Sequence, residues 1–135
     1  MKLLQTLTLQ STYEEIERIE KLLNDLQQEF GFSDEFYARL MLGVSEAATN
    51  GILHGNKLDA SKTVEIKAFK DGRKLVFESK DQGKGFDPEA IPDPLAEENL
   101  LKTSGRGVFL MKEYADDVSY SENGTRLTLT FNLPD

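Results

Sequence analysis

Apolar residues recur every three or four positions in two stretches of the first half of the chain, a spacing that predicts two amphipathic helices. Ser11 with Glu14 three residues later is a capping box that would start the first helix, and Gly31 would end it. Ser33 is the expected N-cap of the second helix, which Gly55 would end. The expected inward positions are Ile16, Ile19, Leu23, Leu26 and Phe30 in the first helix, and Phe36, Leu40, Val44, Ala47 and Gly51 in the second.

Apolar and polar residues alternate in five shorter stretches, which predicts strands. These strands would cover residues 3–9, 63–69, 74–79, 118–121 and 125–133. Asp71-Gly72 favours a hairpin turn between the second and third of these strands, and Asn123-Gly124 favours one between the last two. A third helix is expected to begin at residues 103–107, with Val108, Met111, Tyr114 and Ala115 facing inward. The order of elements predicts an α+β fold, a two-layer sandwich of a mainly antiparallel sheet with three helices on one face.

Composition narrows the class of protein. A chain of 135 residues without cysteine is expected to form a single domain, residues 1–135, that folds without disulfides or thiolate zinc sites. Its net charge of -8 argues against direct binding of nucleic acid, because phosphate backbones require clustered cations. The sequence has no apolar run of membrane-spanning length and no signal-peptide core, so we expect a cytoplasmic protein that does not bind membranes.

Glu46, Asn50 and His54 lie four residues apart and would form a polar stripe along the margin of the second helix. A carboxylate and an amide one turn apart can offer oxygen ligands to hydrated Mg²⁺, and the carboxylate can also accept a proton from a nucleophile. A solvated helix face would show the same pattern. A single histidine near a helix end most often has a structural role.

Two glycine-rich stretches follow. Asp81, Gly83 and Gly85 come directly after the strand 74–79, where glycines would permit close approach of the backbone to a ligand, although an ordinary turn would look similar. Thr103-Ser104-Gly105-Arg106-Gly107 precedes the third expected helix. Free backbone N–H groups at a helix start favour an anionic group such as a phosphate chain.

The segment between these stretches, about residues 87–104, holds three of the four prolines and an acidic pair. A connection of this length suits a lid over a ligand, and a passive surface loop is the alternative. Lys84, Lys102 and Arg106 place positive charge near the glycines, where they would either face phosphates or remain solvated.

A helix carrying Glu46 and Asn50, then Asp81-x-Gly83-x-Gly85 after a strand, then Gly105-x-Gly107 at a helix start resembles the N, G1 and G2 boxes of the GHKL (Bergerat-fold) ATPases. The resemblance covers nearly the whole chain. Within that superfamily, the sequence of residues 44–55 is most similar to that of the anti-sigma factor serine/threonine kinases of bacterial partner-switching systems. The chain lacks the P-loop and protein-kinase motif sets.

The resemblance implies a role for each matching residue. Glu46 would be the general base, Asn50 a Mg²⁺ ligand, and His54 would help to order the site. Asp81 would accept a hydrogen bond from the adenine amino group, and Thr125 would support Asp81 directly or through water, although a strand residue of this type also occurs without a function. The remaining nucleotide-site residues would be Gly83, Gly85, Thr103, Ser104, Gly105, Arg106 and Gly107.

The function implied is an anti-sigma regulatory factor that binds ATP and Mg²⁺ and phosphorylates a serine or threonine of a STAS-type antagonist protein. A sigma factor would be the second partner, and the chain would act as a homodimer. The alternatives are a noncatalytic module whose protein binding is gated by nucleotide, and a kinase with an output other than a sigma factor. His54-Gly55-Asn56 departs from the His-Ala-Tyr ending associated with many anti-sigma kinases.

Overall fold

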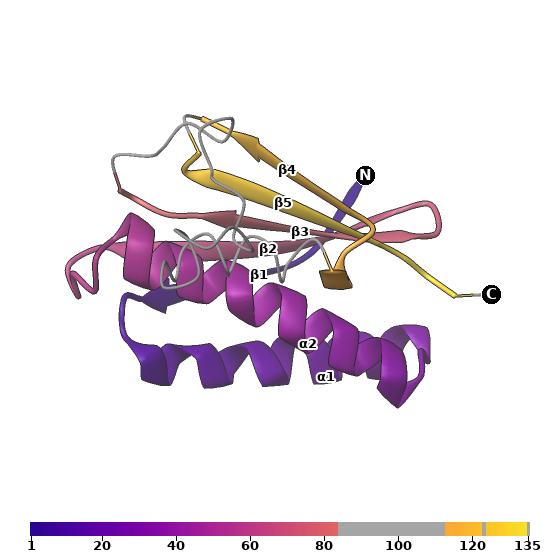
Figure 1. Cartoon of the computed structure of the whole chain (residues 1–135). Helices are drawn as coiled ribbons and strands as arrows, with labels where there is room; N and C mark the ends of the chain where they lie inside the picture. Colours follow the sequence, from indigo (N-terminus) through magenta and orange to yellow (C-terminus); the bar gives the residue numbers. More distant parts are fainter. Residues whose placement is uncertain (84–112, 123, 135) are drawn as a thin grey trace, which may run out of the picture.

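The structure, a computed structural model, describes residues 1–83, 113–122 and 124–134. In chain order its elements are β1 (Lys2–Gln10), a 3₁₀ turn η1 (Tyr13–Ile16), α1 (Glu17–Phe30), α2 (Asp34–Thr49), a π-helical turn η2 (Asn50–Gly55), β2 (Thr63–Asp71), β3 (Lys74–Lys80), β4 (Asp117–Ser121) and β5 (Arg126–Asn132). All pairs in the five-stranded sheet are antiparallel, in the order β1-β2-β3-β5-β4. Helices α1 and α2 lie on the same face of this sheet (Figure 1).

The predicted two-layer α+β fold is therefore confirmed, with two helices in place of three among the described residues. Most of the third expected helix, including Val108 and Met111, lies outside the described residues. Its described end, Glu113 and Tyr114, is helical, and Ala115 is buried as predicted.

The core fills the space between the helices and one face of the sheet. The inner side of α1 contributes Ile19, Leu22, Leu23 and Leu26, and the inner side of α2 contributes Phe36, Leu40, Val44, Ala47 and Ala48. Phe131 of β5 makes edge-to-face contacts with Phe36 and Phe77, with ring centroids 6.5 Å and 5.8 Å apart. The contact with Phe36 joins the two layers and helps to hold α2 against the sheet, whereas the contact with Phe77 lies within the sheet.

Helix ends follow the sequence in two cases and depart from it in one. Ser33 Oγ accepts the backbone N–H of Phe36 at 3.1 Å, and Gly31 ends α1 at a φ of +68°. The capping box predicted for Ser11 and Glu14 is wrong. Ser11 is fully buried and its Oγ donates to the carbonyl of Lys62 at 2.8 Å, so it is not available to the helix start, which forms a 3₁₀ turn instead.

The first predicted hairpin is confirmed, with Gly72 and Arg73 as its loop and Gly72 at a φ of +59°. The second hairpin has a longer loop than its Asn-Gly dipeptide suggests. Ser121 pairs with Arg126, so residue 125, expected in the strand, belongs to the loop. Gly124 has a φ of +82° there.

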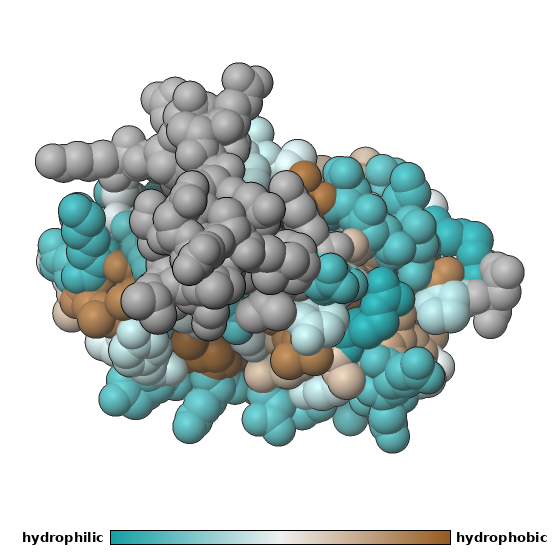
Figure 2. Space-filling view, in the orientation of Figure 1, coloured by the Kyte–Doolittle hydropathy of each residue, from teal (hydrophilic) through white to brown (hydrophobic). Residues whose placement is uncertain are grey.

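The visible surface of the described residues is mainly hydrophilic, and hydrophobic residues appear on it in separate small patches (Figure 2). Within residues 1–83, 113–122 and 124–134, the helices are too short or too polar to cross a membrane.

Candidate functional site

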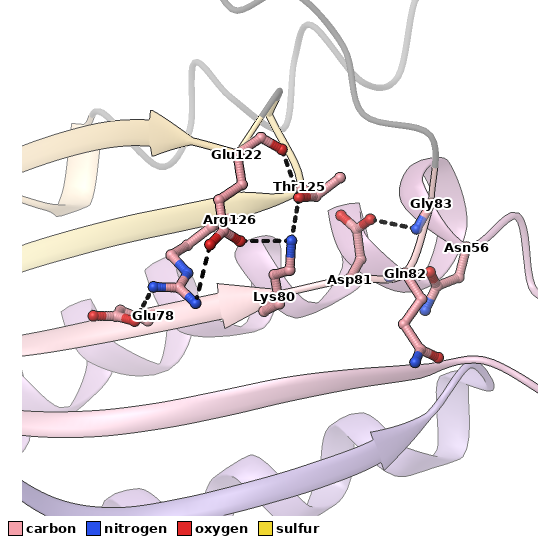
Figure 3. A network of polar contacts seen from close by, with 9 residues as sticks. All are labelled: Asn56, Glu78, Lys80, Asp81, Gln82, Gly83, Glu122, Thr125 and Arg126. Atoms are coloured by element: carbon pink, nitrogen blue, oxygen red, sulfur yellow. Dashed lines mark hydrogen bonds and ion pairs between the residues drawn. The ribbon is translucent and has the colours of Figure 1, made fainter.

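Asp81 directly follows β3 and is 8% exposed. Its backbone N–H donates to the carbonyl of Thr125 at 3.0 Å, which continues the pairing of β3 with the C-terminal hairpin. Its Oδ1 accepts the backbone N–H of Gly83 at 2.8 Å, while Oδ2 makes no hydrogen bond to another described residue. The carboxylate is thus held through Oδ1 by the backbone that follows it (Figure 3).

Three glycines surround this carboxylate. A Cβ at Gly55 would lie 2.4 Å from Asp81 Cγ and Oδ2, and a Cβ at Gly83 would lie 2.1 Å from the carbonyl oxygen of Gly55. A Cβ at Gly51 would lie 3.1 Å from Val64 and 3.5 Å from Asp81 Cβ. Only residues without a side chain allow the end of η2 and the segment after β3 to approach this closely.

Lys80 and Thr125 form a polar cluster beside Asp81 (Figure 3). Lys80 Nζ donates to Thr125 Oγ1 and pairs with Glu122 Oε2 at 2.6 Å, and Thr125 Oγ1 donates to the carbonyl of Glu122 at 2.7 Å. Arg126 lies 3.5 Å from Glu122 and 3.6 Å from Glu78. The Thr125 hydroxyl therefore contacts Lys80, whereas its carbonyl contacts Asp81.

The polar stripe of the second helix lies along α2 and η2, and Glu46, Asn50 and His54 are all partly buried. The helix widens at its end, because the N–H of Asn56 bonds the carbonyl of Gly51 at 2.8 Å, five residues back. The predicted spacing of one α-helical turn between Asn50 and His54 therefore does not hold. Single π turns inside α-helices are frequent at functional sites.

Burial shifts the pKa of three of these groups. It raises the pKa of the Asp81 carboxyl above its ordinary value, although the Gly83 N–H and nearby Lys80 act in the opposite direction. It also raises the pKa of Glu46, and it lowers the pKa of His54. In each case the low-dielectric surroundings disfavour the charged form. A carboxyl group with a raised pKa suits proton transfer.

The structure thus brings together Asp81, Gly83 and the backbone of Thr125. The predicted site residues Gly85, Thr103, Ser104, Gly105, Arg106 and Gly107 lie outside the described residues. Among the described residues, no three His, Cys, Asp or Glu side chains form a cluster that could hold a metal ion.

Sequence reasoning missed three residues near Asp81: Gly55, Asn56 and Lys80. The sequence indicates Gly55 only as a helix stop, because its close packing depends on Asp81, which lies far along the chain. No pattern in the sequence indicates the contact of Lys80 with Thr125, because it depends on the pairing of β3 with β5.

Comparisons with known proteins identify the family. A family model for the histidine kinase-like ATPase domain matches residues 9–131. The serine-protein kinase RsbW of Listeria innocua is 31% identical over 117 residues, which cover 80% of this chain and 73% of the relative. The anti-sigma F factor of Anoxybacillus flavithermus is 35% identical over 95 residues, which cover 67% of this chain and 65% of the relative.

A solved structure of the RsbU and RsbW domains of a Mycobacterium tuberculosis protein has a similar fold, with a TM-score of 0.67 at 16% identity. The match covers 96% of this chain and 31% of that longer chain. Membership of an ATPase family implies that the chain uses ATP. The chain belongs to the histidine kinase-like (GHKL) ATPase family, in the group of the anti-sigma factor kinases.

Proposed function

We propose that this protein binds Mg-ATP and transfers the γ-phosphate to a serine or threonine of a STAS-type antagonist protein. The observation that carries the proposal is the environment of Asp81, a buried carboxylate at a strand end, enclosed by glycines and with one oxygen held by Gly83. That arrangement would present a fixed carboxylate oxygen as a hydrogen-bond acceptor for a base.

Asp81 would read the adenine base. Its Oδ2 would accept the exocyclic amino group, which adenine has at the position where guanine carries a carbonyl oxygen. A fixed carboxylate therefore attracts the one base and repels the other. Gly51, Gly55 and Gly83 would let the helix end and the segment after β3 pack closely around this carboxylate and so hold it in place.

Glu46 would accept the proton of the attacking hydroxyl, since its carboxyl is partly buried and has a raised pKa. Asn50, four residues further along the same helix, supplies an amide oxygen of the kind that Mg²⁺ prefers. A single amide ligand is compatible with Mg²⁺, because this ion often keeps several waters and binds substrate phosphates rather than a protein cage. When bound, the ion would neutralise charge on the phosphates.

The phosphate end of the site would be formed by Thr103, Ser104, Gly105, Arg106 and Gly107, with Gly85 near the base and the segment of about 87–104 as the lid. These residues are assigned from the sequence motifs, and His54 is assigned to the ordering of the site. Thr125 would support Asp81 through its carbonyl and would anchor Lys80 with its hydroxyl.

Partner binding would complete the function. The names of the two relatives, a serine-protein kinase and an anti-sigma F factor, support a protein that both phosphorylates a partner and restrains a sigma factor. In this scheme a homodimer holds the sigma factor and releases it when the unphosphorylated antagonist binds.

The test is transfer of labelled phosphate from ATP to a STAS protein captured from the native cell extract, with the wild-type chain and with Glu46→Gln. The variant should retain nucleotide affinity and lose at least about a hundredfold in transfer rate, within the range for a general base. Wild-type transfer should also decline as pH falls through the raised pKa of Glu46, because only the ionised form accepts a proton. Unchanged transfer by Glu46→Gln would exclude Glu46 as the base.

The second candidate function is a noncatalytic module that binds its partner only in one nucleotide state. The polar site at Asp81 would serve such a module equally well, because nucleotide recognition does not require Glu46. Capture of a partner that remains unphosphorylated while ATP is bound would favour this module.

A further inference from the structure

Asn56 follows η2 and is 1% exposed, although it carries a fully polar side chain. Burial of an amide group without hydrogen bonds is costly, so its partners reveal what it holds in place. Its Nδ2 donates to Ser11 Oγ and to the carbonyl of Thr63, both at 2.9 Å. Its Oδ1 accepts the backbone N–H of Gln82 at 2.8 Å.

This single side chain therefore joins three parts of the chain. Ser11 follows β1, Thr63 begins β2, and Gln82 follows Asp81. The side chain of Gln82 also contacts the start of β2, since its Oε1 accepts the N–H of Thr63 at 2.7 Å. A buried polar network in which both donors and the acceptor are used specifies one arrangement of the backbone.

The contact with Gln82 bears directly on the candidate site. Three consecutive backbone N–H groups each have a fixed acceptor: that of Asp81 bonds Thr125, that of Gln82 bonds Asn56, and that of Gly83 bonds the Asp81 carboxylate. Of these acceptors, the Asn56 amide is the one supplied by a side chain of another element. Figure 3 shows Asn56 and Gln82 on the far side of Asp81 from Lys80.

We infer that Asn56 is a positioning residue for Asp81, which fixes the backbone after β3 and thereby determines how strictly the site selects adenine. The inference rests on the proposed nucleotide-binding function. Asn56 does not touch the ligand, because it is buried behind Gln82. It acts by keeping the Gly83 N–H on Asp81 Oδ1, so that Oδ2 stays aimed at the base.

The test compares Asn56→Ala with Ser11→Ala. Asn56→Ala removes the acceptor of the Gln82 N–H. Ser11→Ala breaks the same buried network at its other end and leaves the bonds of Asn56 to Gln82 and Thr63 in place, so it controls for lost stability. The affinities for ADP and GDP would be measured by calorimetry, well below the unfolding temperature of each variant, and unfolding by urea denaturation.

We expect Asn56→Ala to reduce the preference for ADP over GDP about tenfold, the effect of one hydrogen bond on a charged recognition group. Ser11→Ala should change that preference by less than about twofold, within the error of a distant effect. Amide exchange at Gln82 should be slow in the wild type and in Ser11→Ala, and fast in Asn56→Ala. Equal preferences in the two variants, or losses that simply follow stability, would overturn the inference.

If Asn56→Ala does not fold, Asn56→Asp decides the matter. It keeps an oxygen for the Gln82 N–H and loses both donors, so its preference for ADP should stay within about threefold of the wild type. A tenfold loss in that variant would contradict the positioning role. A wild-type chain that binds neither nucleotide removes the proposed function and this inference together, whereas a wild-type preference that Asn56→Ala leaves intact removes the inference alone.

Discussion

The two halves of the helix formed by α2 and η2 use glycine in opposite ways. In the first half, Gly43 lets the helix approach the sheet at Phe131, and the surroundings are entirely apolar. In the second half, Gly55 lets the helix approach Asp81, and the surroundings are a carboxylate and backbone amides. Close packing stabilises the fold in the first half, whereas in the second it keeps a charged group out of water at a cost.

The difference teaches where stability and function reside in this chain. Around Phe131, any substitution that reduces side-chain volume should destabilise the protein, because the core there is closely packed. The Asp81 half should contain residues whose replacement stabilises the protein while it abolishes binding, since a functional site tolerates local costs that a core does not.

The largest effect is expected from Phe131→Ala. Phe131 is fully buried against Phe36 and Phe77, so its truncation should lower the free energy of unfolding by about 3–5 kcal/mol. Urea denaturation measures the loss. Thr128→Ala, on the same strand but on the opposite face of the sheet, should change stability by less than about 0.5 kcal/mol. A loss below about 1 kcal/mol for Phe131→Ala would mean that this half does not hold the main core.

Gly43→Ala and Gly55→Ala form the matched pair. The new Cβ would lie 2.9 Å from Phe131 Cζ in the first and 2.4 Å from Asp81 Oδ2 in the second, so both should lose about 1–3 kcal/mol of stability. Only Gly55→Ala should also weaken ATP binding, by at least about tenfold, because it displaces the carboxylate that would bind adenine. Calorimetry on both variants checks this. Equal ATP affinities would separate Gly55 from the site.

Asp81→Asn should stabilise the folded protein at neutral pH, whereas most substitutions destabilise it. The raised pKa of Asp81 means that folding favours its protonated form, so its contribution to stability is present below its ordinary value of 3.8 and is lost as pH rises through the folded-state pKa. At neutral pH the neutral amide should therefore be more stable than the carboxylate in the absence of nucleotide. Its Oδ1 can still accept the Gly83 N–H.

The same variant should lose at least about tenfold in ATP affinity, because the amide nitrogen that replaces Oδ2 cannot accept a hydrogen bond from the adenine amino group. Urea denaturation over a pH series and calorimetry with ATP measure the two effects. A stability advantage over the wild type that shrinks as pH rises would contradict a raised pKa for Asp81 in the folded state. Undiminished ATP affinity would exclude Asp81 as the adenine acceptor.

The sequence predicted the elements well because their signals are local. The three- and four-residue spacing in 16–30 and 36–51, the cap at Ser33 and the turn at Gly72 all depend on neighbours along the chain, and the structure confirms them. The capping box at Ser11 could not be judged from neighbouring residues. The Ser11 hydroxyl bonds the carbonyl of Lys62, 51 residues away, instead of capping the helix.

The candidate site was predictable in part for the same reason. Asp81 and Gly83 stand in a recognisable motif, whereas Gly55, Asn56 and Lys80 acquire their roles from contacts across the sheet and between the helix end and the strand end. The π turn that moves His54 away from an α-helical stripe has no signal in the spacing. It follows from the bond between Asn56 N–H and the carbonyl of Gly51.

The smallest effect is expected just beyond the polar half of the helix, where Lys57 and Leu58 have φ values of +52° and +58°. The N–H of Leu58 bonds the carbonyl of Ile52 at 2.8 Å, so the chain reverses here as it does after many helices, but without the usual glycine. Left-handed backbone costs a residue with a side chain about 1–2 kcal/mol, a cost that Lys57→Gly would remove.

Lys57→Gly should therefore raise the free energy of unfolding by about 0.5–1 kcal/mol, because the greater freedom of glycine in the unfolded chain offsets part of the relief. Lys57→Ala removes the same charge and keeps the strained backbone, so it should give no gain. Because Lys57 is exposed, ATP affinity should not change in either variant. Equal stabilities for the two variants would show that the relief of left-handed strain at residue 57 does not exceed the entropic cost of glycine.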